Sequence, residues 1–166
     1  IKFYKKKFQV SKINCSTKFK QKLNKNLFLV YTGISRTAHK IASSYTNNLN
    51  KKKRENIKNI LKIVDRAKKS IKQNNCDDFG SLLHETWVEK RTLSKSVTTN
   101  KIDHFYDRGL KNGALGGKLL GAGGGGFILF YVESNKIPMF KRAFSNNILV
   151  PVNMSDKGSE VIFHEK

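Results

Sequence analysis

The sequence predicts an α+β fold in which an antiparallel or mixed sheet is covered by helices. Two runs of apolar, β-branched and aromatic residues, 27–32 (LFLVYT) and 127–132 (FILFYV), have the composition of buried strands. Most of the sequence between them carries apolar residues at helical spacing instead. Because strands stand at both ends of a helical stretch, the layout favours helices packed on one sheet over alternating strand–helix units.

The first half of the chain predicts a hairpin, a strand and then helices. Residues 1–10 (IKFYKKKFQV) alternate loosely around three lysines, which is typical of an exposed hairpin. After the strand at 27–32, Gly33 ends the strand and Ser35 can cap the first helix. The apolar positions of the four expected helices are Ala38, Ile41, Ala42, Tyr45 and Leu49; Ile57, Ile60, Leu61, Val64 and Ile71; Phe79, Leu82, Leu83 and Trp87; Ile102, Phe105, Tyr106 and Leu110.

The last part of the chain predicts a return to strands. A short helix is expected near 138–144, followed by a strand at 147–152 (NILVPV). Pro151 cannot donate a hydrogen bond to a sheet, so this strand should lie at an edge or end there. A last short strand is expected at 160–163.

Composition limits the class of protein. The 166 residues have room for one domain, or for one and a part, and no apolar run is long enough to span a membrane. The chain begins with Ile1, so we expect either processing or a longer parent protein. Cys15 and Cys76 are isolated and form no CxxC pattern, which indicates reduced packing thiols in a cytoplasmic protein.

The net charge of +21 suggests an anionic partner such as nucleic acid or a membrane surface. Most of the positive charge comes from lysine, whereas specific nucleic-acid sites favour arginine forks and stacking aromatics. Lysine, asparagine and isoleucine share A/T-rich codons, so compositional drift of the genome can produce the same excess. A non-catalytic basic module that binds RNA or an anionic surface stays as the alternative function.

The glycine-rich stretch 121–126 (GAGGGG) is the strongest local signal. It satisfies GxGxxG, but we expect the order helix, loop, strand, whereas a dinucleotide site needs strand, loop, helix. A Walker motif is excluded because Phe127, not lysine, follows the last glycine. Successive glycines can form an anion-binding concavity, with Lys118 adding positive charge. A tight helix-to-strand connection packed under another element is the structural alternative, and Gly113, Gly116 and Gly117 are expected to extend a mobile region upstream.

Three stretches carry a resemblance to a known family. The sequence GALGGKLLGAGGGGFILFYV (113–132) resembles the third signature motif of the GHMP superfamily of galactokinase, homoserine kinase, mevalonate kinase and phosphomevalonate kinase. Residues 27–41 and 79–117 are similar to the D-glycero-D-manno-heptose 7-phosphate kinase family within it. The resemblance implies a ferredoxin-like C-terminal lobe at 35–166, preceded by trailing strands of the N-terminal lobe at 1–34.

The resemblance also implies an activity. Such an enzyme transfers the γ-phosphoryl group of ATP, with Mg²⁺, to the anomeric hydroxyl of a heptose 7-phosphate. The family's phosphate-binding PxxxGLGSSA motif, its early PGR motif and its catalytic aspartate in a DQYAA stretch are not found in the sequence. The chain is therefore expected to be the C-terminal part of such a kinase, inactive without the missing N-terminal lobe, or a decayed or split remnant.

Few side chains outside the glycine loop are candidates for the site. Arg36 follows a strand end near a helix start and could recognise a phosphate, with a solvated surface arginine equally compatible. Lys90 and Arg91 could reach the same phosphate, but a charged helix face is favoured. His84 is expected to be a polar contact or a surface residue, and no metal-ligand spacing occurs. The residues assigned to loop support and to substrate or phosphate contact are Lys118, Gly121, Gly123, Gly124, Gly125 and Gly126.

Overall fold

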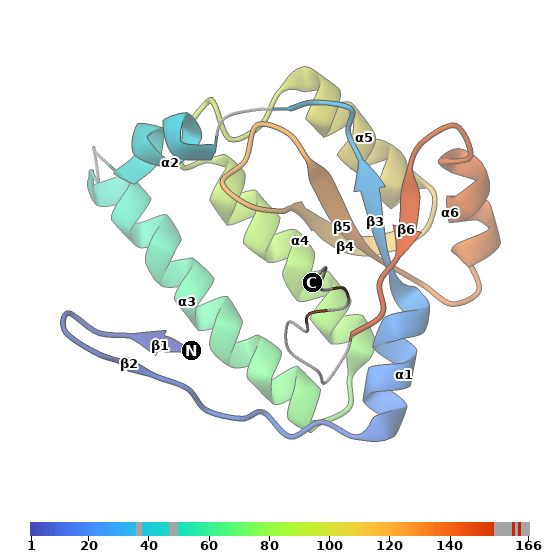
Figure 1. The fold of residues 1–166 in the computed structure, drawn as a ribbon, viewed down its shortest axis with the longest axis horizontal. Helices are drawn as coiled ribbons and strands as arrows, with labels where there is room; N and C mark the ends of the chain where they lie inside the picture. Colours follow the sequence, from blue (N-terminus) through green and yellow to red (C-terminus); the bar gives the residue numbers. More distant parts are fainter. Residues whose placement is uncertain (36–37, 47–49, 155–160, 162, 164–166) are drawn as a thin grey trace.

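The computed structural model describes residues 1–35, 38–46, 50–154, 161 and 163 of the chain. Its main sheet has four antiparallel strands in the order β4-β5-β3-β6, and a separate two-stranded sheet pairs β1 with β2. Figure 1 shows the four-stranded sheet flanked by α5 and α6, with α3 and α4 side by side to the left of β3. The expected α+β fold with a helix-covered antiparallel sheet is confirmed.

The N-terminal segment forms the expected exposed hairpin from β1 (Lys2–Phe3) and β2 (Phe8–Gln9). It is followed by α1 (Thr17–Asn26), which the sequence did not predict. Ser16 caps this helix by accepting a hydrogen bond from the Phe19 amide at 3.0 Å. The helix is rich in lysine and polar residues, and it is held to the protein by its two buried apolar side chains, Phe19 and Leu23.

The central helices are α2 (Ala38–Thr46), α3 (Lys51–Lys72), α4 (Cys76–Arg91) and α5 (Asn100–Lys111). Asn50, Asn75 and Thr99 cap the last three through side-chain oxygens, which explains why each begins where it does. The helices expected around residues 57–71, 79–87 and 102–110 are therefore confirmed. The Ser35 cap expected for α2 depends on residues 36 and 37, which lie outside the described residues.

Two strands, β4 (Ala114–Leu119) and β5 (Phe127–Val132), form a hairpin around the glycine-rich stretch. The expectation that 113–117 continue a mobile region after a helix is wrong, because Gly116 and Gly117 pair with Tyr131 and Phe130 inside the sheet. The order around the glycines is strand, loop, strand. A dinucleotide motif stays excluded, since no helix follows the loop.

The C-terminal part contains α6 (Ile137–Ala143) and the edge strand β6 (Leu149–Pro151). Pro151 is the last residue of that edge strand, as its missing N–H predicts. The strand expected at 160–163 falls largely outside the described residues, and Val161 and Phe163 belong to no strand. Cys76 is buried, Cys15 is exposed, and both are free thiols.

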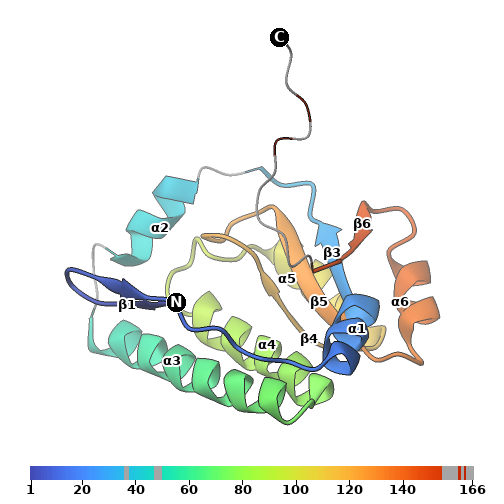
Figure 2. The same cartoon turned by 60° about the horizontal axis from the view of Figure 1, so that its bottom comes forward.

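Two apolar clusters hold the sheet and the helices together. The larger is rich in aromatic residues and packs one sheet face against α5, α6 and the C-terminal half of α4. The smaller joins the other face to α1 and to the start of α4. Figure 2 shows α3 and α4 lying as a layer below the sheet. Among its described residues the structure has no helix long and apolar enough to cross a membrane.

The strand β3 (Leu27–Tyr31) lies inside the four-stranded sheet, paired with β5 on one side and β6 on the other. Its registry joins Leu29 to Leu129 and to Val150. A domain boundary at residue 34 remains a prediction. The pairing of β3 argues for placing such a boundary before Leu27, because a cut at 34 would separate a central strand from its neighbours.

Candidate functional site

The glycine loop, residues 120–126, closes the β4–β5 hairpin. The Leu120 amide donates to the Phe127 carbonyl at 2.9 Å, which brings the two ends of the loop together. Four loop residues have positive φ angles that side chains rarely adopt. These are Gly121 at 67°, Gly123 at 119°, Gly124 at 74° and Gly126 at 91°.

Two neighbouring segments hold the glycine loop in place. The Gly124 amide donates to the Val97 carbonyl at 2.8 Å, and the Gly126 amide donates to the Ile34 carbonyl at 2.9 Å. A Cβ atom would lie 2.9 Å from the Val97 oxygen at Gly123 and 2.5 Å from the Ile34 oxygen at Gly125. The loop is therefore wedged between the α4–α5 connection and the segment after β3.

These contacts divide the glycines into two groups. Gly123 and Gly125 are required where the backbone of another segment comes close, which is the structural alternative that the sequence left open. The amides of Gly124 and Gly126 are already bonded to protein carbonyls, so they do not contribute to an anion-binding concavity. A Cβ at Gly121 would meet nothing within 4 Å, and Gly121 is exposed, so the loop is open on that side.

Lys90, near the end of α4, contacts the glycine loop directly. Its Nζ donates to the Gly121 carbonyl at 2.5 Å and to the Leu119 carbonyl at 3.3 Å. The expectation that Lys90 belongs to a solvated helix face is therefore wrong. Burial, with repulsion from Lys118, lowers its pKa to about 8. The sequence feature that could have revealed this contact is the spacing of Lys90 from Trp87, which is fully buried. Residues three apart in a helix share a face, so Lys90 lies on the packed side of α4.

Lys118 is the last residue but one of β4 and is half-buried. Burial lowers the pKa of its ammonium group. Among the described residues, no carboxylate forms an ion pair with Lys118 or with Lys90. The structure thus places two half-buried cations at the loop end of β4, and the described residues supply no carboxylate partner for either.

Arg91, next to Lys90, has a different role. Its Nη2 lies 2.9 Å from Oδ2 of Asp103, and Thr98 donates to the other oxygen of that carboxylate at 2.7 Å. These contacts join the end of α4 to the start of α5 across the segment that contains Val97. Arg91 therefore supports the segment against which the glycine loop packs.

His84 forms a polar contact, as expected from the sequence. Its Nδ1 lies 2.8 Å from the hydroxyl of Tyr106, and that hydroxyl donates to the Gly117 carbonyl at 3.2 Å. Burial raises the pKa of Tyr106, so its hydroxyl stays protonated and able to donate. These contacts fix β4 against α4 and α5, just before the loop.

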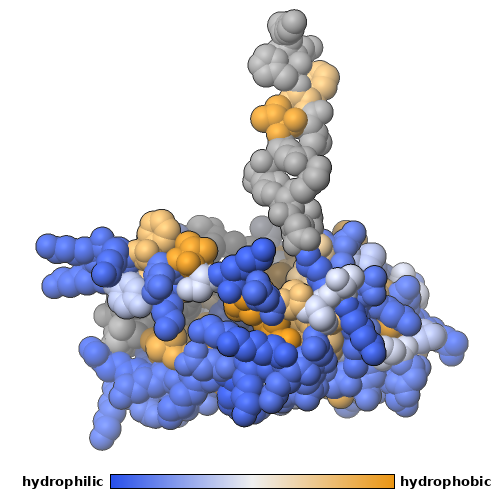
Figure 3. All heavy atoms as spheres, turned by 90° about the horizontal axis from the view of Figure 1, so that it is seen from below, coloured by the Kyte–Doolittle hydropathy of each residue, from blue (hydrophilic) through white to orange (hydrophobic). Residues whose placement is uncertain are grey.

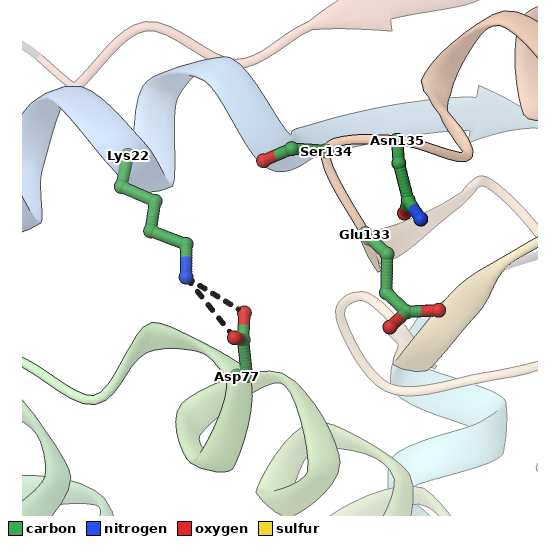
Figure 4. A pocket seen from close by; sticks show the side chains of 5 residues that line it. All are labelled: Lys22, Asp77, Glu133, Ser134 and Asn135. Atoms are coloured by element: carbon green, nitrogen blue, oxygen red, sulfur yellow. Dashed lines mark hydrogen bonds and ion pairs between the residues drawn. The ribbon is translucent and has the colours of Figure 1, made fainter.

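A separate polar pocket of about 260 Å³ lies at the other end of β5 (Figure 4). Lys22 and Asp77 form an ion pair across it at 3.0 Å, and Tyr131 donates to Asp77 at 2.7 Å. Burial alone would raise the pKa of Asp77, but the hydrogen bonds from Tyr131 and Lys22 lower it overall. The remaining lining residues are Glu133, Ser134 and Asn135. Because Lys22 and Asp77 neutralise each other, this pocket is a weaker candidate for a functional site than the glycine loop.

Two further expectations concern Arg36 and metal binding. Arg36 lies outside the described residues, so its contact with a phosphate stays a prediction. In the described part of the chain, no group of three or more histidine, cysteine, aspartate or glutamate residues could hold a metal ion.

Comparison with known proteins agrees with this fold and loop. Residues 67–146 match the family described as "GHMP kinases C terminal", a span that includes α4, α5 and the whole β4–β5 hairpin. This region of the chain, residues 67–146, is thus similar to the C-terminal domain of the GHMP kinases.

Two of the curated relatives are sugar kinases. The chain is 28% identical over 109 residues to D-glycero-alpha-D-manno-heptose 7-phosphate kinase of Campylobacter jejuni, covering 65% of this chain and 32% of that protein. It is 35% identical over 85 residues to galactokinase of Clostridium tetani, covering 51% and 21%. The chain thus spans a third or less of these two curated relatives.

A solved structure shows the same fold over nearly all of the chain. A putative sugar kinase from Campylobacter jejuni superposes with a TM-score of 0.66 at 21% identity, covering 94% of this chain and 44% of that one. The expected α+β fold is therefore shared with a solved structure over nearly the whole chain.

Proposed function

We propose that this chain forms the C-terminal part of an ATP-dependent sugar kinase that phosphorylates a heptose 7-phosphate at its anomeric hydroxyl. The observation that carries the proposal is the glycine loop: it lies within the matched family region and is held rigidly by Val97 and Ile34. The similarity to a heptose 7-phosphate kinase supports this acceptor. The kinase family also favours this function over the alternative of a basic RNA-binding module.

The glycine loop would serve as a rigid wall of the acceptor site. Phosphoryl transfer depends mainly on positioning and on stabilisation of charge, so a fixed loop with adjacent cations fits the task. Gly123, Gly124, Gly125 and Gly126 would keep the loop in shape. Lys118 and Gly121, on the open side, would contact the substrate or its phosphate.

The remainder of the chemistry would come from outside this chain. The sequence contains neither the family's phosphate-binding motif nor its catalytic aspartate, and the described residues do not form a metal site. ATP and Mg²⁺ would therefore be bound chiefly by an N-terminal lobe, in the cytoplasm. The 166 residues alone are expected to catalyse no transfer.

The test is a chimera. The C-terminal portion of the Campylobacter jejuni heptose 7-phosphate kinase is replaced by residues 1–166, and ADP release is measured with heptose 7-phosphate. We expect ATP-dependent turnover by the chimera and none by the isolated chain. The matched control is the chimera with Gly123→Val, whose side chain would strike the Val97 backbone and displace the loop, lowering turnover by about 100-fold. A folded chimera that phosphorylates no sugar, or full turnover by the isolated chain, would contradict the proposal.

A further inference from the structure

Lys90 and Lys118 form a pair of amines at the open side of the glycine loop. Lys90 reaches this position from α4 and is fixed by the Gly121 and Leu119 carbonyls. Lys118 precedes Leu119 in β4, and the Leu119 carbonyl accepts a hydrogen bond from Lys90, so both lysines lie at the loop end of β4. The two amines therefore come from segments that only the folded structure brings together.

The charge of this pair is not balanced within the described part of the protein. The ion pairs there join Lys22 to Asp77, Arg66 to Glu85, Lys68 to Asp65 and Arg91 to Asp103. Partial burial of an ammonium group without a counter-charge costs free energy, because the charge loses hydration. Two such groups at the same end of β4 favour a site for an anion that the described residues do not supply.

We propose that Lys90 and Lys118 bind a terminal phosphate group of a substrate at the mouth of the glycine loop. This inference deepens the proposed function, on which it rests, by assigning a phosphorylated substrate to this side of the loop. A terminal phosphate carries close to two negative charges and several acceptor oxygens at neutral pH, which matches two ammonium groups. Gly121 leaves room for it, since no protein atom lies within 4 Å of the position of a Cβ there.

Lys90 would act on the loop and on the phosphate at once. Two of its three N–H donors are used by the Leu119 and Gly121 carbonyls, so one donor is left for the anion. Lys118 keeps its three donors, because no described acceptor bonds to its Nζ. Binding of the anion would therefore tie the end of α4 and the end of β4 to the substrate through a single group.

The experiment is a titration of the chain followed by lysine ¹H–¹³C NMR, with the Lys90 and Lys118 signals assigned from Lys90→Met and Lys118→Met. The probes are inorganic phosphate, mannose 6-phosphate, mannose and ATP at constant ionic strength. We expect phosphate and mannose 6-phosphate to shift both signals together and mannose to leave them unchanged. The pKa of Lys90 should also rise from about 8 toward its ordinary value when phosphate is present.

The variants separate the site from general attraction to a highly positive chain. Lys118→Met should weaken the phosphate affinity seen at Lys90 by about tenfold. Lys62→Met, which removes an exposed lysine of α3, should leave that affinity unchanged. Phosphate shifts at Lys62 as large as those at Lys90 and Lys118 would overturn the inference.

The titration with ATP identifies which substrate supplies the phosphate. Tighter binding of mannose 6-phosphate than of ATP assigns the pair to the acceptor, and the reverse order assigns it to the nucleotide. Because binding is measured without turnover, an inactive chimera with an intact phosphate site would refute only the proposed function. An active chimera whose lysine pair binds no phosphate would refute only this inference.

Discussion

The protein contains two antiparallel hairpins whose environments are opposite. The β1–β2 hairpin turns through three lysines and is closed by a bond from the Tyr4 amide to the Lys7 carbonyl at 2.8 Å, and all of its residues are exposed. The β4–β5 hairpin turns through the glycine loop and lies in the centre of the fold. Its strand β5 contains Ile128, Phe130, Tyr131 and Val132, all of which are fully buried.

The difference shows that the hairpin topology alone does not decide rigidity. The β1–β2 turn is closed within itself, whereas the glycine loop is held by carbonyls of two distant segments. Lysines keep the first hairpin in water, and Figure 3 shows a mostly hydrophilic surface on the lower face of the molecule. Glycines let the second hairpin approach neighbouring backbone. The glycine loop is therefore fixed by other segments of the fold, whereas the first turn is closed only by its own backbone.

The largest expected effect compares one phenylalanine from each hairpin. Phe130 is fully buried and packs against Tyr106, Phe140 and Phe144, so Phe130→Ala should lower the free energy of unfolding by about 3–5 kcal/mol. Phe8 is 67% exposed, so Phe8→Ala should change the free energy of unfolding by less than about 0.5 kcal/mol. Urea unfolding followed by circular dichroism measures both. Equal losses for the two variants would show that the N-terminal hairpin belongs to the core.

A smaller effect is expected within the buried hairpin, where two glycines serve different purposes. At Gly116 a Cβ would lie 2.3 Å from the Gly80 carbonyl and 2.8 Å from the His84 amide, so Gly116→Ala should push α4 away and cost about 3 kcal/mol. At Gly121 there is no neighbour, and only the φ of 67° opposes a side chain, so Gly121→Ala should cost about 1 kcal/mol. The thermal midpoints should fall in that order. The reverse order would mean that backbone conformation outweighs packing against α4.

The last prediction concerns Lys90 and pH. Folding lowers its pKa from 10.5 to about 8, mainly through burial. Between these pH values the unfolded chain binds more protons at Lys90 than the folded chain does. The free energy of unfolding should therefore rise with pH across this window, and the contribution of Lys90 should be constant below about pH 8. Lys90→Met should remove part of the rise, whereas Lys62→Met should keep all of it. The measurement is the free energy of unfolding of both variants and of the parent chain at several pH values. If this free energy rose equally with pH in Lys90→Met and in the parent chain, Lys90 would not be desolvated by folding.

Much of the fold could be predicted from the sequence, because its elements have strong local signals. The strand at 27–32 and the helices around 57–71 and 102–110 follow apolar spacing and caps. Two elements were missed for identifiable reasons. The helix α1 is short of apolar residues, and β4 carries Gly116 and Gly117, which have low strand propensity and are stabilised only by pairing with β5 and by contact with α4.

The sequence by itself determined the candidate site: a glycine-rich turn beside a lysine, in a pattern that resembles the GHMP kinases. Only the tertiary structure decided which atoms compose it. Val97 and Ile34 are distant from the glycines in the chain, yet their carbonyls take the amides of Gly124 and Gly126. From the sequence, Lys90 is expected to be a surface residue of a helix. In the structure α4 packs against β4, and the amine of Lys90 donates a hydrogen bond to the Gly121 carbonyl. Local patterns encode backbone conformation and burial, whereas the partners of a buried amide or amine depend on how separate segments pack.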